Sequence, residues 1–143
     1  MKVKHIRLLL SISLFTVFYS CDRMDKNGNL EGNWQMTTWI DKATGDTIAD
    51  RTSYLYYTVR LEMIQFQQKY NPAFPCLAYF EHNGEEVILG KAYQNTANSD
   101  SLVSISYLRC FGVSADGRFH VDYLSDEHLT LSNTDNILYF RKH

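Results

Sequence analysis

Apolar and polar residues alternate along much of the chain after residue 30. Every second position from 55 to 63 is apolar: Leu55, Tyr57, Val59, Leu61 and Met63. Because successive side chains of an extended chain point to opposite faces, this alternation predicts one long strand over 55–64 with one buried face. A helix is the competing interpretation, but the many aromatic and β-branched residues favour a strand.

Turn-forming residues divide the rest of the chain into further strands. Asn83-Gly84 gives the strongest of these turn signals, because both central positions of a type I′ hairpin turn need positive φ. Segments 41–46, 115–118, 125–128 and 133–136 have similar turn composition. The predicted strands are 33–40, 55–64, 76–82, 86–93, 102–113, 119–123, 129–132 and 137–142, and a short helical turn is expected within 45–53.

Eight consecutive strands joined by short turns predict an all-β fold. The expected architecture is a small antiparallel up-and-down barrel, since closure removes the strand edges that would otherwise pair with other chains. A β-sandwich is the alternative, because counting strands along a sequence does not show whether the sheet closes.

The first twenty residues have the pattern of an export signal. Three basic residues precede an apolar run over 8–18, and polar residues follow Cys21 too early for a membrane-spanning helix. The sequence Phe18-Tyr19-Ser20-Cys21 resembles the lipobox of bacterial lipoproteins, in which the peptidase cuts before the cysteine and the cysteine receives lipid. The alternative is an ordinary secretory peptide cut near Ser20. The predicted organisation is a lipoprotein signal peptide 1–20, a lipidated Cys21 with a flexible tether over 21–29, and one domain over 30–143.

Composition and charge narrow the partners. The 143 residues are 45% hydrophobic and 21% charged, as expected for one globular domain. Loss of the signal peptide removes three basic residues and no acidic one, which changes the formal net charge from −2 to −5. We therefore expect no binding to nucleic acid, and membrane attachment through the N-terminal lipid. The expected location is the cell envelope, at the outer membrane, facing the periplasm or the surface.

Two short motifs at the ends of the domain carry a family resemblance. The Gly32-Asn33-Trp34 segment is similar to the Gly-x-Trp opening of lipocalins. Segments 119–131 and 138–142 are similar to the ending of lipocalin-like lipoproteins of Gram-negative, Bacteroidota-type bacteria, which are largely of unknown function. The resemblance implies a small barrel in which a basic residue of the last strand covers Trp34. Strand parity favours Lys142 and side-chain chemistry favours Arg141, while the alternative leaves both in solvent.

This resemblance implies binding of a small, mainly apolar ligand in a barrel cup, without catalysis. The residues expected to line that cup are Met36, Tyr57, Val59, Leu61, Phe80, Ile105, Tyr107 and Phe119. The alternative is a solid barrel that acts as a protein-interaction module, either an accessory subunit of an envelope complex or an inhibitor. The volume of the interior distinguishes the two.

No motif predicts an enzyme, a metal site or a cofactor. His120 and Asp122 share one strand face and His128 follows the next turn, but a solvated outer face explains the three residues better. Cys76 and Cys110 remain after lipidation, and export permits a disulfide between them. Against that bond, the two cysteines fall on predicted strands that are not neighbours, and the alternative is two free thiols.

Overall fold

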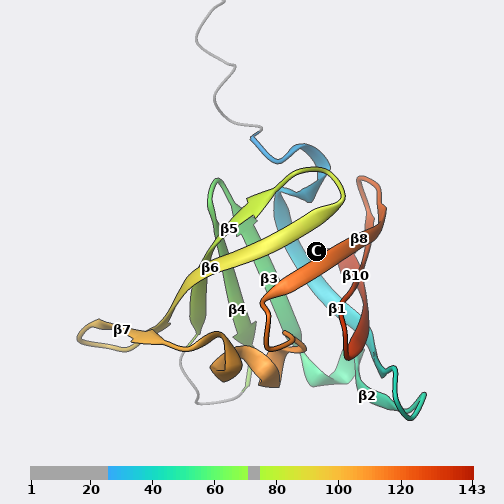
Figure 1. Ribbon diagram of the computed structural model, residues 1–143, viewed down its shortest axis with the longest axis horizontal. Coiled ribbons are helices and arrows are strands. Elements are labelled where there is room, and N and C mark those ends of the chain that lie inside the picture. Colours follow the sequence, from blue (N-terminus) through green and yellow to red (C-terminus); the bar gives the residue numbers. More distant parts are fainter. Residues whose placement is uncertain (1–25, 71–74) are drawn as a thin grey trace, which may run out of the picture.

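The computed structural model describes residues 26–70 and 75–143 (Figure 1). The predicted signal peptide and the lipidation site Cys21 lie outside the described residues, as does the tether up to residue 25. The elements, in chain order, are η2 (Gly28–Leu30), β1 (Gly32–Asp41), β2 (Thr47–Asp50), η3 (Arg51–Ser53), β3 (Leu55–Arg60), β4 (Met63–Gln68), β5 (Cys76–His82), β6 (Glu86–Asn95), β7 (Asp100–Val103), η4 (Ile105–Phe111), β8 (Arg118–Leu124), β9 (His128–Ser132) and β10 (Asn136–Lys142). The η elements are short 3₁₀-helices.

Eight of the strands close into an antiparallel barrel. Their order around the barrel is β1, β3, β4, β5, β6, β8, β9 and β10, and β10 pairs back onto β1 from Trp34 opposite Lys142 to Asp41 opposite Asn136. Strand β2 pairs with the end of β1, and β7 pairs with the end of β6, so neither belongs to the ring. The predicted closed up-and-down barrel is therefore confirmed, and the sandwich alternative is wrong.

The long strand predicted over 55–64 is wrong. Two strands, β3 and β4, occupy this part of the chain, and Arg60 pairs with Met63 across a two-residue turn of Leu61 and Glu62. Because the chain reverses, the positions that face the core shift by one residue. Ile64 is buried, whereas the alternation predicted that Met63 would face the core. Leu61 and Glu62 are not typical turn residues, and this is why the pattern concealed the turn.

The strand predicted over 102–113 is also wrong. Strand β7 ends at Val103, and the chain then forms η4. The buried residues here, Leu108 and Phe111, are three apart with Ile105 preceding them, which is the repeat of a 3₁₀-helix. The other predicted strands agree with the structure to within two residues, and the expected helical turn within 45–53 is η3, which follows β2.

Aromatic rings fill the middle of the barrel. Tyr57 lies at the centre of this group, with its ring centroid 4.6 Å from that of Phe66, 4.8 Å from that of Phe140 and 6.3 Å from that of Phe119. All four side chains are almost fully buried. A small eight-stranded barrel has room for such a packed core, and here aromatic side chains occupy it.

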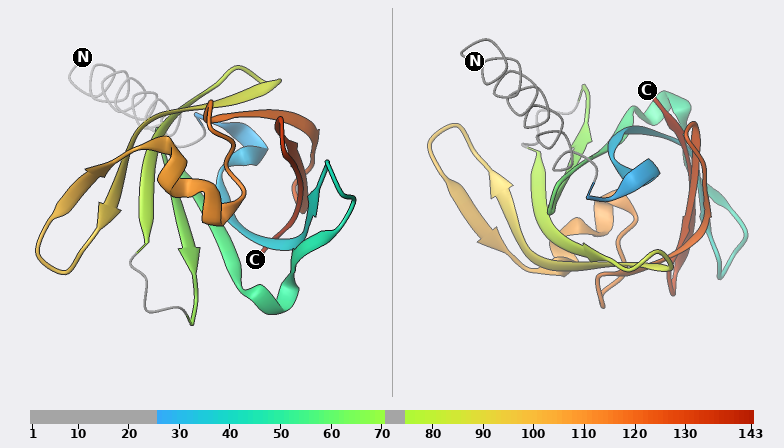
Figure 2. Two further views of the ribbon diagram at one scale, coloured as in Figure 1. Left: turned by 60° about the horizontal axis from the view of Figure 1, so that its bottom comes forward. Right: turned by 90° about the horizontal axis from the view of Figure 1, so that it is seen from above.

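The two ends of the barrel differ. At the end that we call the base, β1 begins, β10 ends, and the β3–β4, β5–β6 and β8–β9 turns gather. Figure 2 (right) looks onto the base and shows η2, in blue, lying across the ring of strands. At the opposite end, the mouth, η4 lies across the strands, and Figure 2 (left) shows it in orange in front of them.

Candidate functional site

The base is closed around Trp34. Its indole Nε1 donates a hydrogen bond to the Leu30 carbonyl at 2.8 Å. The Lys142 ammonium lies 4.7 Å from the Trp34 ring centroid and donates to the Asn29 carbonyl at 3.0 Å. Gly32 has φ of 134°, and a Cβ on it would stand 3.0 Å from the Lys142 side chain, so a glycine is needed for this close approach.

Of the two basic residues proposed to cover Trp34, the structure places Lys142 there. Lys142 shares the inward parity of Leu138 and Phe140, whereas Arg141 is exposed. The geometry follows the alternation of strand side chains.

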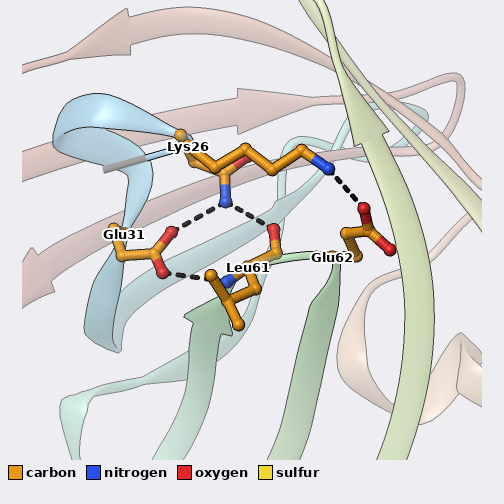
Figure 3. Close-up of polar contacts among 5 residues, drawn as sticks. Lys26, Glu31, Leu61 and Glu62 are labelled. Carbon is orange, nitrogen blue, oxygen red and sulfur yellow. Dashed lines mark hydrogen bonds and ion pairs between the residues drawn. The ribbon is translucent and has the colours of Figure 1, made fainter. Parts of the chain in front are cut away.

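A polar network, which we call the base latch, ties the N-terminal segment to the β3–β4 turn (Figure 3). The Asn27 amide donates to a Glu31 carboxylate oxygen at 2.7 Å and to the Leu61 carbonyl at 2.6 Å. The Leu61 backbone N–H donates to the other Glu31 oxygen at 2.8 Å. Lys26 forms an ion pair with Glu62, and its hydrogen bond and charge lower the pKa of that carboxyl. Both residues of the β3–β4 turn are thus held by the segment that leads into the barrel.

Leu61 has an unusual backbone conformation. Its φ is 52°, in the left-handed region that residues other than glycine, asparagine and aspartate rarely occupy, and its side chain is 55% exposed. Strained residues persist where the surrounding structure holds them, and they are frequent at binding sites. The base latch supplies such support, because it holds both the backbone N–H and the carbonyl of Leu61.

A pocket of about 570 Å³, which we call the base pocket, opens beside the latch. Its described lining comes from the N-terminal segment, the β3–β4 turn and the facing strands β5 and β6. These lining residues are Lys26, Asn27, Leu61, Glu62, Tyr79, Phe80, Glu81, His82, Ile88, Leu89 and Gly90. Phe80 and Leu89 are buried while Tyr79 and Glu81 are exposed, so the pocket extends from the edge of the core to the surface.

His82, one of the lining residues, carries an unsatisfied polar atom. Its Nε2 is shielded from solvent and has no hydrogen-bond partner among the described residues. Burial lowers the pKa of the imidazole, and a hydrogen bond with the Gly84 backbone opposes that shift only in part. A buried polar atom without a partner is destabilising unless a ligand or water satisfies it.

The mouth is covered by η4 and the residue that follows it. The Tyr57 hydroxyl donates to the Phe111 carbonyl at 2.6 Å, and burial raises its pKa well above the usual value. The side-chain amides of Asn133 and Asn136 donate to the Gly112 carbonyl at 2.8 and 3.0 Å. These bonds connect η4 to β3 and to the β9–β10 turn, and they hold it across the mouth.

The residues predicted to line a cup are distributed over three places. Met36, Tyr57, Val59 and Phe119 belong to the packed core, Leu61 and Phe80 line the base pocket, and Ile105 and Tyr107 lie on η4. Tyr107 is 47% exposed, and Leu61 belongs to a turn at the base, so neither points into a cup at the mouth. The prediction from sequence missed Asn27, His82 and Leu89, although it placed the Asn83-Gly84 hairpin that positions the last two.

The other candidate groups stay apart. His120 Nδ1 lies 2.9 Å from an Asp122 carboxylate oxygen on the exposed face of β8. His128 lies on β9, opposite Arg141 of β10 in the strand register. No group of three metal-ligating side chains occurs within residues 26–70 and 75–143. Cys76 is a buried free thiol and Cys110 an exposed one, so the structure contains no disulfide between them. Within the same residues, no helix is long and apolar enough to cross a membrane.

Comparison with known proteins identifies the fold. The family described as the lipocalin-like domain matches residues 14–143. A lipocalin-like protein from Bacteroides uniformis ATCC 8492 superimposes with a TM-score of 0.57 at 22% identity, over 81% of this chain and 100% of that one. An uncharacterised protein from Bacteroides eggerthii DSM 20697 gives a TM-score of 0.52 at 20% identity, over 79% of this chain and 98% of that one. The search of curated proteins gave no match.

Proposed function

The chain belongs to the lipocalin-like domain family, and we propose that it is a lipid-anchored protein of the bacterial cell envelope that binds a small, mainly apolar ligand without catalysis. We place the ligand in the base pocket and not in a cup at the mouth. The observation that carries this proposal is the pocket volume of about 570 Å³, because small-molecule sites typically measure ~300–1,000 Å³. The mouth is covered by η4, and aromatic rings fill the core behind it.

The lining of the base pocket suits a ligand with a large apolar part. Leu61, Phe80, Ile88 and Leu89 offer apolar surface, and Leu61 is held in its exposed position by the base latch. His82 also belongs to the lining, and its buried Nε2 has no hydrogen-bond partner among the described residues. Apolar side chains together with polar groups that fix orientation are common in such sites, and here Lys26, Asn27, Glu62, Glu81 and His82 supply the polar part of the lining.

Two leucine variants test ligand binding in this pocket. Leu61→Asn removes apolar surface at the pocket rim, and asparagine tolerates the left-handed conformation. Leu102→Asn is the matched control, because Leu102 is 68% exposed on β7 and lies outside the pocket lining. Burial of a leucine side chain contributes ~1.5–3 kcal/mol, and about half of that remains for a half-exposed one, so Leu61→Asn should weaken binding roughly fivefold.

Displacement of a lipophilic dye and native mass spectrometry measure this effect. We expect wild-type protein and Leu102→Asn to bind the dye equally and Leu61→Asn to bind it more weakly. Absence of any bound ligand or dye, or equal binding by all three proteins, would refute a ligand site at the base.

Lipid anchoring is a separate part of the proposal. It is supported by the basic start, the apolar run and the position of Cys21 directly after that run. Radiolabelled palmitate should enter the wild-type protein in cells and should not enter a Cys21→Ala variant. Equal labelling of both proteins would contradict anchoring through Cys21.

An interaction module is the second candidate, favoured by an apolar stripe on the outer face of the barrel. Tyr79 and Tyr93 have ring centroids 6.3 Å apart, and Tyr93 pairs with the exposed Leu102 across β6 and β7. Exposed aromatic clusters are enriched at protein interfaces. Affinity purification from detergent-solubilised envelope should then recover a partner with wild-type protein and lose it with Leu102→Asn, whereas Leu61→Asn should retain it.

A further inference from the structure

We propose that the base pocket faces the membrane and takes up a single-chain amphiphile with a zwitterionic headgroup from the bilayer. This inference rests on the proposed function, because it names the ligand class and the direction of entry for the same pocket. Three observations carry it: the length of chain between the anchor and the barrel, the place where that chain joins the barrel, and the charges of the pocket lining.

The chain between the predicted anchor and the barrel is short. Only five residue steps separate Cys21 from Lys26, the first described residue. A fully extended chain covers at most ~3.6 Å per residue, so this segment spans no more than about 18 Å. The seven residues of β10 alone extend over roughly 23 Å at the usual strand rise. The anchor therefore keeps the base close to the bilayer. When the barrel axis is perpendicular to the bilayer, the distance from the bilayer to the mouth exceeds the length of the tether.

The base latch fixes the point at which the tether ends. Asn27 is buried and bonded to both Glu31 and the Leu61 carbonyl, and Lys26 is paired with Glu62. While these contacts are made, the distance that the tether can span is set by the residues between Cys21 and Lys26 alone. Lys26 and Asn27 are themselves part of the pocket lining, so the pocket lies at the tether's point of attachment.

The charges of the lining select the headgroup. The lining contains three formally charged side chains, and Lys26 and Glu62 neutralise each other. Glu81 is exposed and has no ion-pair partner within residues 26–70 and 75–143. A single uncompensated carboxylate repels an anionic headgroup and attracts a cationic one. The choline of a phosphocholine places a positive charge where Glu81 can contact it.

Binding in solution tests the ligand class. Unlipidated Cys21→Ala protein is titrated with alkyl phosphocholines of increasing chain length, below their micellar concentrations, and with the matched alkyl sulfates. Each added methylene should tighten binding about fourfold until the pocket is full, as expected for burial of one methylene. Dodecyl sulfate should bind several-fold more weakly than dodecylphosphocholine, and Glu81→Gln should narrow that difference while leaving the unfolding midpoint unchanged.

A second measurement tests the orientation, with lipidated protein in phosphatidylcholine nanodiscs. A fluorophore is attached at Glu127→Cys in the base or at Thr134→Cys at the mouth, both in a Cys110→Ser background. A quencher on the lipid headgroups should quench the base position more strongly than the mouth position. Insertion of a flexible Gly/Ser linker of about twenty residues before Lys26 should remove the difference, because the longer tether no longer holds the base at the surface.

The two measurements separate the two proposals. Failure of every amphiphile to bind in solution overturns the proposed function together with this inference. Binding that is insensitive to chain length or favours the sulfate overturns the ligand class alone. Binding in solution with equal quenching at Glu127 and Thr134 overturns entry from the membrane and leaves ligand binding standing.

Discussion

Replacement of Lys142 by methionine tests whether the base is held by an ammonium over Trp34. Methionine keeps an unbranched apolar side chain at this position but removes the charge 4.7 Å from the ring centroid and the hydrogen bond to the Asn29 carbonyl. A cation–π contact contributes ~0.5–2 kcal/mol and a hydrogen bond from a charged group ~1.5–3 kcal/mol. Because the side chain is partly exposed, we take values near the lower limits and expect a loss of about 2 kcal/mol in the free energy of unfolding.

Urea denaturation followed by tryptophan fluorescence measures this loss, and thermal unfolding should show a decrease of roughly 6–8 °C in Tm. Arg141→Met is the matched control, because Arg141 is the adjacent basic residue and is exposed. It should change stability by less than ~0.5 kcal/mol. Lys142→Arg should retain most of the stability, since a guanidinium also stacks on an indole. Equal losses for Lys142→Met and Arg141→Met would refute the assignment of Lys142 as the residue that closes the base.

Three further predictions concern the mouth and the base pocket. Gly112→Ala should destabilise the domain by at least ~2 kcal/mol in urea denaturation, because Gly112 has φ of 89° and the added Cβ would stand 2.9 Å from the Leu138 side chain. An unchanged unfolding midpoint would contradict the packing of η4. Tyr57→Phe should cost ~1–3 kcal/mol in the same assay, because it leaves the buried Phe111 carbonyl without its donor, and a smaller effect would mean that water replaces the hydroxyl. Burial lowers the pKa of His82, so the unfolded chain binds the proton more readily and stability should decrease as pH falls below about 6.5. Below this pH the unfolding midpoint of wild type should decrease more steeply than that of His82→Gln, and equal pH dependence of the two proteins would contradict the burial of His82.

The closed barrel was predictable because most of its strands have one face in the core and one in water. In β10 the apolar residues Leu138 and Phe140 alternate with exposed ones, and the turn before the strand, 133–136, carries the usual turn residues. The predicted number of barrel strands, eight, is correct only because two errors cancel. One predicted strand, 55–64, contains two strands, and another, 102–113, contains none of the ring.

Each of these errors has a local physical cause. The apolar alternation continues in phase through Leu61 and Met63, although the chain reverses between Arg60 and Met63. In the second segment, Ile105, Tyr107 and Phe111 fit a period of two, whereas Ile105, Leu108 and Phe111 fit the period of three that η4 uses. Periodicity alone cannot decide between a strand and a short helix when apolar residues satisfy both repeats.

The closure of the base was accessible from sequence, and the base pocket was not. Gly32 and Trp34 lie two residues apart in one short motif, and parity alone singles out Lys142 on the last strand. The pocket, in contrast, joins Asn27, Leu61 and His82 from three segments that are distant in sequence. Their proximity depends on barrel closure and on a turn that the sequence pattern concealed.

That concealed turn also has a consequence for function. A glycine or asparagine at position 61 would adopt the observed φ of 52° with less strain, yet the chain carries leucine there and supports it with Glu31 and Asn27. Departures from local turn preferences are expected mainly at functional sites, where a side chain is retained for what it contacts. The side chain that this strain presents is apolar, largely exposed and at the rim of the base pocket. A leucine held in this way is better explained by contact with a ligand than by the stability of the turn, and the comparison of Leu61→Asn with Leu102→Asn measures that difference directly.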